Sequence, residues 1–459
     1  MTSEHLIKNH DELCNHGEQS ARKNALDIIE EGILRAIPYQ ETKRLLTVKN
    51  NHLSIGKRII DLNEVANIYV LGVGKGAYPI ALAIEEALGA RITDGIVLIK
   101  QGDTRRLKHI ELVESGHPLP NQEGLDASLR IRAILKKAKE RDLVLAPITG
   151  GSSAMMNILP EGITLKDLIT VNDLLLKSGA SISKMNAVRK HLCDMKGGRF
   201  VEHANPAEVH TFTLNTATPE MLWPDLVNPD PTTFSDAISV LKNFNLWEAV
   251  PESIRKHLTQ GLQNPAMETP KTITNANNYI HYVADPVTAC QAMADKAREM
   301  GYSAHILSTA LEGEASSLGI FLAGITNETV QRNQPFTPPC VLISGGETTV
   351  TIGDKKPGVG GPNQETALGY VSKLFVKSPC VCISLDSDGT DGPTEIAGGI
   401  VDNTTGVLAQ ELNISISQAL IEHDSSKALV GLGDAIITGH TGTNIMNLRL
   451  VLIERAKEK

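Results

Sequence analysis

Short runs of aliphatic residues alternate along the chain with stretches in which apolar residues recur every three or four positions. The runs predict buried strands, and the spaced stretches predict amphipathic helices. Regular alternation of the two favours an α/β fold with mainly parallel sheets flanked by helices. The strands predicted in the first half of the chain are 67–73, 95–100, 142–148 and 208–214, and the helices are 77–90, 122–140, 164–178, 185–195 and 232–263.

A second block of the same kind begins near residue 280, after the polar stretch 263–279. We therefore predict two unequal α/β domains, a Rossmann-like one over residues 1–270 and another over 280–459. The sequence leaves open which of the two domains the N-terminal helix packs against. The second block has predicted helices at 286–300, 311–328 and 363–375, and predicted strands at 303–308, 338–344, 347–353, 380–385, 434–439 and 448–454.

Composition narrows the range of partners. The chain has 459 residues, a formal net charge of -9 and only 3% aromatic residues, which disfavours nucleic-acid binding. It has neither a continuous apolar run of membrane-spanning length nor a signal-peptide pattern at its start. The six cysteines show neither metal-site nor disulfide spacing. We expect a cytoplasmic protein with reduced thiols and with no membrane or nucleic-acid partner.

Three carboxylates, Asp386, Asp388 and Asp391, follow the predicted strand 380–385. A calcium loop of the EF-hand type does not fit, because its sixth position would be Asp391 instead of Gly and its twelfth would be Ala397. The stretch LDSDGT also resembles the opening motif of haloacid-dehalogenase phosphatases, but too little chain follows it for such a domain. This stretch is therefore a magnesium site, a substrate site or a structural turn.

Lys75 lies in the glycine-rich stretch LGVGKGAYPIA that follows the first predicted strand. The stretch fits a degenerate dinucleotide motif, but the next strand ends in Lys100 and Gln101 without the ribose-binding acid, which disfavours a nicotinamide cofactor. Lys75 is then a cation for a phosphate or carboxylate group, or a solvated loop lysine.

Two further glycine turns follow predicted strands. Gly150 and Gly151 precede Ser152 and Ser153, and Gly345 and Gly346 precede Glu347. Such turns expose backbone N–H groups that bind anions, or they only connect a strand to a helix.

Four cations, Arg189, Lys190, Lys196 and Arg199, are close in sequence in an acidic chain. They form an anion-binding face or a solvated charged face. Asn363 and Gln364 begin a predicted helix, where Asn363 is a ligand-binding residue or only an N-cap. His117 is a turn residue or a catalytic one.

Ten motifs occur in order over about residues 20–455 and together resemble the class II glycerate 2-kinases. They are GVGKGA, SGHPLPNQEGLDAS, ITGGSSA, KMNAVRKHLCDMKGGR, NPDPTTFSDA, LEGEA, LISGGETTVT, GGPNQE, DSDGTDGPTEIAGGIVD and TGTNIMNLRLVLI. This family carries a C-terminal MOFRL domain, and its members are often called hydroxypyruvate reductases. The resemblance implies two α/β domains, the second MOFRL-like, with an active site in the cleft between them. It also implies transfer of the γ-phosphoryl group of ATP to the 2-hydroxyl of D-glycerate with a divalent metal.

The resemblance makes Lys75 a catalytic cation and puts both glycine turns, Asn363, Gln364 and the Asp386–Asp391 loop around the cleft. We hypothesise that Lys75, Arg189 and Lys196 bind the triphosphate together with the turns Gly150–Ser153 and Gly345–Gly346. Asp386, Asp388 and Asp391 are the candidate Mg²⁺ ligands, and Glu347 or Asp386 orients the acceptor hydroxyl.

Two departures leave the acceptor open. The family usually has Ser-Asp and then an ASGPT loop where this chain has Asn215-Thr216 and MLWPDLVNPDP, and it usually has Arg where this chain has Pro362. The acceptor is then D-glycerate, another sugar acid, a polyol or a keto sugar. Rival hypotheses are an NAD(P)H-dependent hydroxypyruvate reductase and a non-enzymatic sugar-acid sensor. A homodimer is one option for the assembly.

Overall fold

The structure is a computed structural model that describes residues 5–214, 223–353 and 357–455. The chain forms two compact units. We call residues 38–283 the N-terminal unit, and residues 1–37 with 284–459 the C-terminal unit. This division differs from the expected one, since the first 37 residues belong with the end of the chain. No helix in the described ranges has the length and apolarity that crossing a bilayer requires.

The N-terminal unit contains a six-stranded sheet of order β6-β5-β4-β7-β8-β9. The pairs joining β6, β5, β4, β7 and β8 are all parallel, which confirms the predicted parallel sheet. Aliphatic residues of the central strands are fully buried, as continuous apolar runs predict for strands covered on both faces. The strands are β4 Asn67–Val73, β5 Asp94–Lys100, β6 Glu111–Ser115, β7 Asp142–Pro147, β8 Glu208–Leu214 and β9 Asn278–Ala284.

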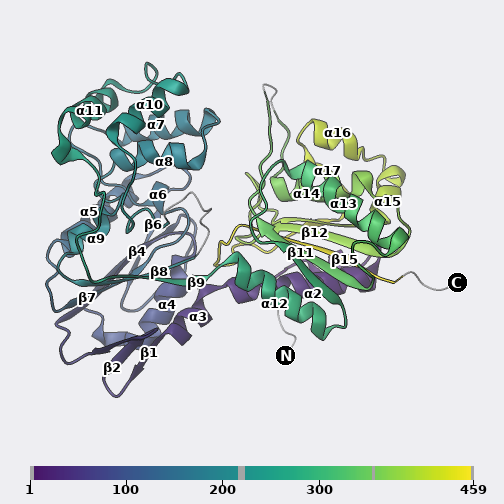
Figure 1. Cartoon of the computed structure of the whole chain (residues 1–459), viewed down its shortest axis with the longest axis horizontal. Helices are drawn as coiled ribbons and strands as arrows, with labels where there is room; N and C mark the ends of the chain where they lie inside the picture. The colour runs from purple at the N-terminus through teal and green to yellow at the C-terminus, as the bar shows by residue number, and fades with distance from the viewer. Residues whose placement is uncertain (1–4, 215–222, 354–356, 456–459) are drawn as a thin grey trace. The chain divides into compact units, whose positions relative to one another are not determined.

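Helices of this unit fall into two groups. The first includes α4 Ala77–Leu88, α5 Gln122–Leu135, α6 Ser152–Met155 and α9 Arg199–Ala204. The second forms a hydrophobic cluster of its own, visible at the top of this unit in Figure 1. It consists of α7 Leu165–Lys177, α8 Ile182–His191, α10 Phe234–Asn243 and α11 Glu252–Gln263. The long helical stretch predicted over 232–263 is therefore two helices.

A small antiparallel sheet in the N-terminal unit was not predicted. It consists of β1 Leu46–Lys49, β2 His52–Ile55 and β3 Arg58–Asp61, preceded by α3 Pro38–Leu45. Asn50 and Asn51 connect β1 to β2 with φ values of 50° and 61°. Two asparagines at positive φ are typical of a tight hairpin, so the Asn-Asn pair was a usable indication.

The C-terminal unit has a six-stranded sheet of order β10-β11-β15-β12-β13-β14. Only β10 and β11 pair in parallel, and the other pairs are antiparallel. The prediction of a mainly parallel sheet is wrong here, because strands buried on both faces give the same apolar runs in either direction. The strands are β10 Ser303–Ser308, β11 Cys340–Gly346, β12 Cys380–Asp386, β13 Gly398–Asp402, β14 Ala435–Ile436 and β15 Asn447–Ile453.

Two pairs of helices enclose this sheet, as Figure 1 shows. One face carries α13 Ala315–Arg332 and α14 Pro362–Lys373, and the other carries α2 Gln19–Ala36 and α12 Pro286–Glu299. The remaining helices are α1 His10–Leu13, α15 Thr405–Glu411, α16 Ile416–Ile421 and α17 Ser425–Leu432.

Arg22 explains why α2 belongs to the C-terminal unit. Its side chain is fully buried and pairs with Asp402 and Asp434, the latter at 2.8 Å. Burial alone would lower the pKa of Arg22, but the carboxylates of Asp434 and Asp402 raise it above its ordinary value. A buried cation paired in this way fixes the helix on the sheet.

The strand predicted over 347–353 is not present. Strand β11 ends at Gly346, whose φ is +126°, and Thr349 makes only an isolated bridge to Glu314. A side chain at Gly346 would place its Cβ 2.2 Å from the backbone nitrogen of Leu311. The close crossing of this loop therefore requires glycine and ends the strand.

Candidate active site

The turns after β4 and β7 bind each other through backbone groups. Lys75 N donates to Gly150 O at 2.9 Å, and Gly76 N donates to Thr149 Oγ1 at 2.9 Å. Gly74 has φ +138°, and a Cβ there would lie 2.6 Å from Thr149 O. The two turns can approach this closely only because Gly74 has no side chain.

Lys75 and His117 both pack over Gly151. A Cβ on Gly151, which has φ +90°, would lie 3.2 Å from Lys75 Cγ and 3.2 Å from His117 Cδ2. The neighbouring hydroxyls of Ser152 and Ser153 are buried and have no hydrogen-bond partner in the part of the chain that the structure describes. The structure therefore gathers a lysine, an imidazole and two hydroxyls with spare donors around a glycine turn. The helix after the turn, α6, has only four residues.

The cations Arg189, Lys190 and Lys196 are buried, so they do not form a solvated face. Each donates one side-chain hydrogen bond within the described part of the chain. Arg189 Nε donates to Asn172 Oδ1 at 2.8 Å, Lys190 Nζ to Asp230 Oδ1 at 3.2 Å, and Lys196 Nζ to Asn157 Oδ1. Burial lowers the pKa of Arg189. Asn157 is four residues beyond Ser153, which links this cation cluster to the glycine turn. Arg199 instead donates to backbone carbonyls, including Met267 O at 3.0 Å.

Asp225 is the buried carboxyl group beside these cations. Neither of its carboxyl oxygens has a hydrogen-bond partner among the described residues. Burial raises the pKa of Asp225, although the charges of Lys196, Lys190 and Arg189 oppose the shift. The backbone oxygen of Asp225 accepts from Gly197 N at 2.7 Å, which holds the residue in place. Asp225 was not among the residues predicted from the sequence, although it lies in the segment that departs from the family pattern.

In the C-terminal unit, Asp391 caps helix α14. Its Oδ1 accepts from the backbone N and side-chain Nδ2 of Asn363 at 3.1 and 2.9 Å, and its Oδ2 accepts from Gln364 N at 2.9 Å. Burial raises the pKa of Asp391 to about 6, although these donors lower it. Asn363 is not the N-cap, which is Gly361, and it also accepts from Ser384 Oγ at 2.7 Å.

The other two loop carboxylates accept hydrogen bonds within their own loop and from Asn444. Asp386 Oδ1 accepts from Asp388 N at 3.0 Å. Asp388 Oδ1 accepts from Thr390 N at 3.0 Å and from Thr390 Oγ1 at 2.7 Å, while its Oδ2 accepts from Asn444 Nδ2 at 3.1 Å. Asp386 is partly accessible, and Asp388 is 8% exposed. These two are therefore better placed than Asp391 to offer oxygen ligands to a cation.

Arg449 lies on the central strand β15, between Ser344 and Ser384 of its two neighbours. It is 1% exposed, and its Nη2 donates to Thr348 Oγ1 at 2.7 Å. Its Nε and Nη1 have no hydrogen-bond partner in the described ranges. Burial lowers the pKa of Arg449 to about 10, although the charges of Glu347, Asp391 and Asp386 oppose the shift. A single arginine inside the apolar run NLRLVLI is the sequence signal that could have identified Arg449.

Gly345 and Gly346 do not form a turn. They are the last residues of β11, opposite Leu448 and Asn447 of β15, and Gly345 O accepts from Leu311 N at 2.9 Å. Glu347, the next residue, is exposed. Asn447 lies between these groups, with its amide nitrogen toward Asp386 and its oxygen toward Arg449. The structure thus brings Glu347, Asn363, Gln364 and the Asp386–Asp391 loop together with Arg449 in one unit.

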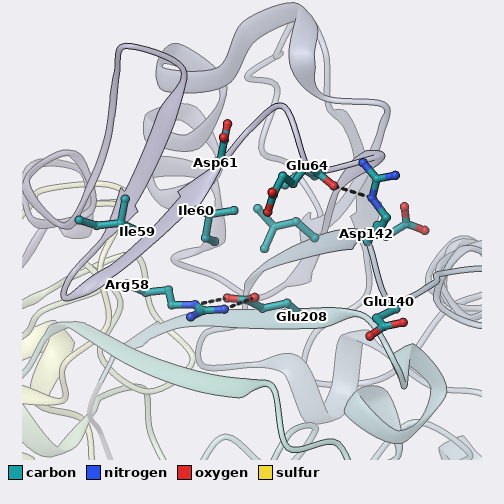
Figure 2. Close-up of a pocket in the computed structure, with 11 residues that line it drawn as sticks. Arg58, Ile59, Ile60, Asp61, Glu64, Glu140, Asp142 and Glu208 are labelled. Carbon is teal, nitrogen blue, oxygen red and sulfur yellow. Dashed lines mark hydrogen bonds and ion pairs between the residues drawn. The ribbon is translucent and has the colours of Figure 1, made fainter.

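A pocket of about 700 Å³ lies elsewhere, at the amino ends of β7 and β8, and Figure 2 shows its lining. Both arginines that line it already donate to groups of its wall. Arg58 donates twice to Glu208 at 3.0 Å, and Arg141 Nε donates to Glu64 O at 2.8 Å. Ligands of parallel α/β sheets bind at the opposite, carboxyl ends of strands, where Lys75 and Gly150 lie. None of the expected site residues lines this pocket.

Two family profiles and several known proteins are similar to this chain. The profile of a domain of unknown function (DUF4147) matches residues 24–259, and that of the MOFRL family matches residues 340–447. A glycerate 2-kinase of Pyrococcus horikoshii is 38% identical over 94% of this chain and 97% of its own. A protein of Agrobacterium vitis named putative hydroxypyruvate reductase is 36% identical over 84% of this chain and 86% of its own.

Among solved structures, a glycerate kinase of Thermotoga maritima superposes with a TM-score of 0.80 at 33% identity. The match covers 95% of this chain and all of that one. Both units are therefore represented in a single known architecture. The chain belongs to the MOFRL-domain family that includes the class II glycerate 2-kinases.

Proposed function

We propose that the protein is an ATP-dependent kinase that phosphorylates the 2-hydroxyl of D-glycerate or of a closely related small sugar acid. The observation that carries this proposal is the 38% identity to a glycerate 2-kinase over nearly the full length of both chains. The buried cation cluster supports it, because phosphoryl transfer depends on alignment and charge neutralisation more than on covalent chemistry.

The N-terminal unit supplies groups for an anionic ligand. Lys75, the hydroxyls of Ser152 and Ser153, and the Gly150–Gly151 turn bind phosphate oxygens in our proposal. Arg189 and Lys196 hold further negative charge from a buried position, where an electrostatic contact is stronger than in water. The hydroxyls of Ser152 and Ser153 support this assignment, since they have no partner among the described residues and buried polar atoms normally have one.

We assign Asp225 to the acceptor hydroxyl, ahead of Glu347 and Asp386. In the reaction the bond from the γ-phosphorus to the bridging oxygen of ADP breaks, and a bond to the acceptor oxygen forms. The proton of the acceptor hydroxyl must leave to a base. The carboxyl oxygens of Asp225 are buried and have no hydrogen-bond partner among the described residues, and burial raises its pKa, so the group has spare acceptor positions and binds a proton more tightly than an exposed aspartate does.

The C-terminal unit supplies oxygen ligands for Mg²⁺. Asp386 and Asp388 fit the preference of Mg²⁺ for a few carboxylates with water and phosphate, while Asp391 is occupied in capping α14. Bound Mg²⁺ would neutralise phosphate charge. Arg449 lies beside these carboxylates, and its Nε and Nη1 have no partner within the described ranges. It supplies a guanidinium in a chain that has Pro362 where the family motif usually has Arg.

The test is ADP release from Mg-ATP with D-glycerate, four-carbon sugar acids, erythrulose-like sugars and hydroxypyruvate, with NADH oxidation followed in parallel. We expect ADP release with D-glycerate and a phosphorus signal coupled to the C2 proton of the product. NADH oxidation without ATP would instead support a reductase, as the name of the Agrobacterium relative suggests for that protein. Tight binding of a sugar acid with no ADP release would support a sensor.

Other expectations remain predictions. Residues Asn215 and Thr216 lie outside the described residues, so their effect on the acceptor is open to the same substrate screen. The cytoplasmic location and a homodimeric assembly are likewise predictions, which fractionation and light scattering would test.

A further inference from the structure

Four side chains of the N-terminal segment and helix α2 converge in the C-terminal unit. Asp27 and Glu30 are three residues apart on α2 and therefore lie on one face of the helix. His5 Nδ1 lies 2.8 Å from Glu30 Oε2, and His10 Nε2 lies 3.1 Å from Asp27 Oδ1. One possible ligand atom of each residue lies within 4.8 Å of the others. Two imidazoles and two carboxylates thus surround one point.

His10 has an unmet hydrogen bond in this arrangement. It is 3% exposed, and its Nδ1 has no hydrogen-bond partner among the described residues. If Nε2 donates its proton to Asp27, Nδ1 is a buried acceptor, and no donor among the described residues reaches it. A cation bound at Nε2 would fix the other tautomer, with the proton on Nδ1. Asp11 Oδ1, at 3.7 Å from Nδ1, is then near enough to accept that proton after a small rotation.

The rings of His5 and His10 stack against each other, which brings their nitrogens to the same place. Their centroids are 3.9 Å apart, and their planes differ by 7°. Both imidazoles therefore lie beside the carboxylates of Asp27 and Glu30, whose two negative charges a divalent cation would balance.

The surroundings give a cation both attraction and access. A pocket of about 1020 Å³ opens beside the cluster. Its lining includes the acids Asp11, Glu12 and Glu31 in addition to Asp27 and Glu30, whereas its lysines are Lys8 and Lys296. The excess of carboxylates makes the local potential negative, and the opening leaves a route for a hydrated ion.

We propose that His5, His10, Asp27 and Glu30 form a binding site for one divalent transition-metal ion, with Zn²⁺ the best match. Imidazole and carboxylate are both common zinc ligands, and four of them complete a closed, tetrahedral, structural site. Mg²⁺ is a poor match, because it prefers oxygen ligands and keeps several waters. The ion joins residues 5–10 to α2 and so fastens the N-terminal segment to the sheet that α2 covers. The site is separate from the kinase groups assigned above.

The test uses the full chain, stripped with a chelator and dialysed against Zn²⁺ without nucleotide, with bound metal measured by mass spectrometry. We expect one Zn²⁺ per chain, a higher melting temperature with Zn²⁺ than with chelator, and visible absorption bands of tetrahedral Co²⁺ when Co²⁺ replaces Zn²⁺. His10→Ala and Asp27→Asn should each weaken binding at least about tenfold, since even outer-shell partners contribute that much.

His16→Ala is the matched control. His16 comes from the same segment and also contacts a carboxylate, Asp434, at 2.9 Å, but Arg22 lies beside that pair and excludes a cation. The control should bind Zn²⁺ like the unmodified chain. If His10→Ala fails to fold, His5→Ala decides, because the His5 side chain is 38% exposed. Equal Zn²⁺ binding by the unmodified chain and these variants, or no binding at all, would overturn the proposal, whatever the kinase assay shows.

Discussion

Two arginines in the C-terminal unit, Arg22 and Arg449, are equally buried but differ in their partners. Every nitrogen of the Arg22 guanidinium has a partner, and two carboxylates raise its pKa. The Nη2 of Arg449 donates to Thr348 Oγ1 and faces the oxygen of Asn447, whereas its Nε and Nη1 have no partner among the described residues, and burial lowers its pKa to about 10. A satisfied buried charge stabilises a fold, whereas an unsatisfied one is unfavourable until a ligand arrives. The difference separates a structural arginine from a candidate binding residue.

The largest effect we expect is from Arg22→Met. The change leaves Asp402 and Asp434 buried without their cation, which should lower the free energy of unfolding by about 3–5 kcal/mol. Urea denaturation measures the loss, and Lys23→Met, at the exposed neighbouring position, is the control that should change it little. A small loss from Arg22→Met would mean that hydrogen-bond satisfaction does not identify structural charges in this protein.

Lys75→Ala should leave stability nearly unchanged but lower kcat. Lys75 is only partly buried and lies at the carboxyl end of β4, where it is proposed to hold transferring phosphoryl oxygens. Loss of one preorganised donor lowers rates by about 10²–10³-fold. Steady-state ADP release measures the effect, and Lys57→Ala, in the turn between β2 and β3, is the matched control. Unchanged turnover would remove Lys75 from the mechanism.

Arg449→Met tests the comparison most directly. We expect a melting temperature equal to or above that of the unmodified chain, because an incompletely paired buried charge is removed. Activity should fall about 10–100-fold, since a hydrogen bond from a charged group to a ligand contributes about 1.5–3 kcal/mol. Differential scanning calorimetry and the KM for Mg-ATP measure the two effects. Unfolding as severe as that of Arg22→Met would make Arg449 structural and end the distinction.

Sequence patterns predicted some parts of this molecule better than others. Local runs of apolar and glycine residues predicted the strand 67–73 and the turn at Lys75. Alternation of strands and helices predicted the parallel direction of the neighbouring strands. Strand direction in the second sheet did not follow from the same alternation, because β15 comes from the end of the chain and inserts between β11 and β12. The contacts of Asp391 with Asn363 and Gln364 join residues far apart in sequence, so the motif gave the residue types but not their bonds.

Asp225 and Arg449 escaped prediction for a related reason. What distinguishes them is burial without partners, and burial of a charged residue depends on the whole fold. A lone arginine in an apolar strand and an acid in a proline-rich loop are the local traces of this property. These two local patterns are enough to make Arg449 and Asp225 candidate site residues.

The smallest predicted effect concerns the pH dependence of stability, which Asp391 controls. Its folded-state pKa, about 6, lies above the ordinary aspartate value of 3.8, so the folded state binds the proton more tightly than the unfolded state does. The stabilisation from that proton is complete below about pH 4 and disappears as the pH rises through 6.

An asparagine cannot titrate, yet its amide oxygen can still accept a bond from the α14 backbone. The difference in unfolding free energy between the unmodified chain and Asp391→Asn should therefore shift by about 2 kcal/mol between pH 4 and pH 7, toward the variant at the higher pH. Urea titrations at a series of pH values measure this shift, with Asp61→Asn, at the partly exposed end of β3 in the other unit, as control. A pH-independent difference would show that Asp391 is ionised throughout, and its capping bonds would then outweigh its burial, as the carboxylates around Arg22 outweigh the burial of that arginine.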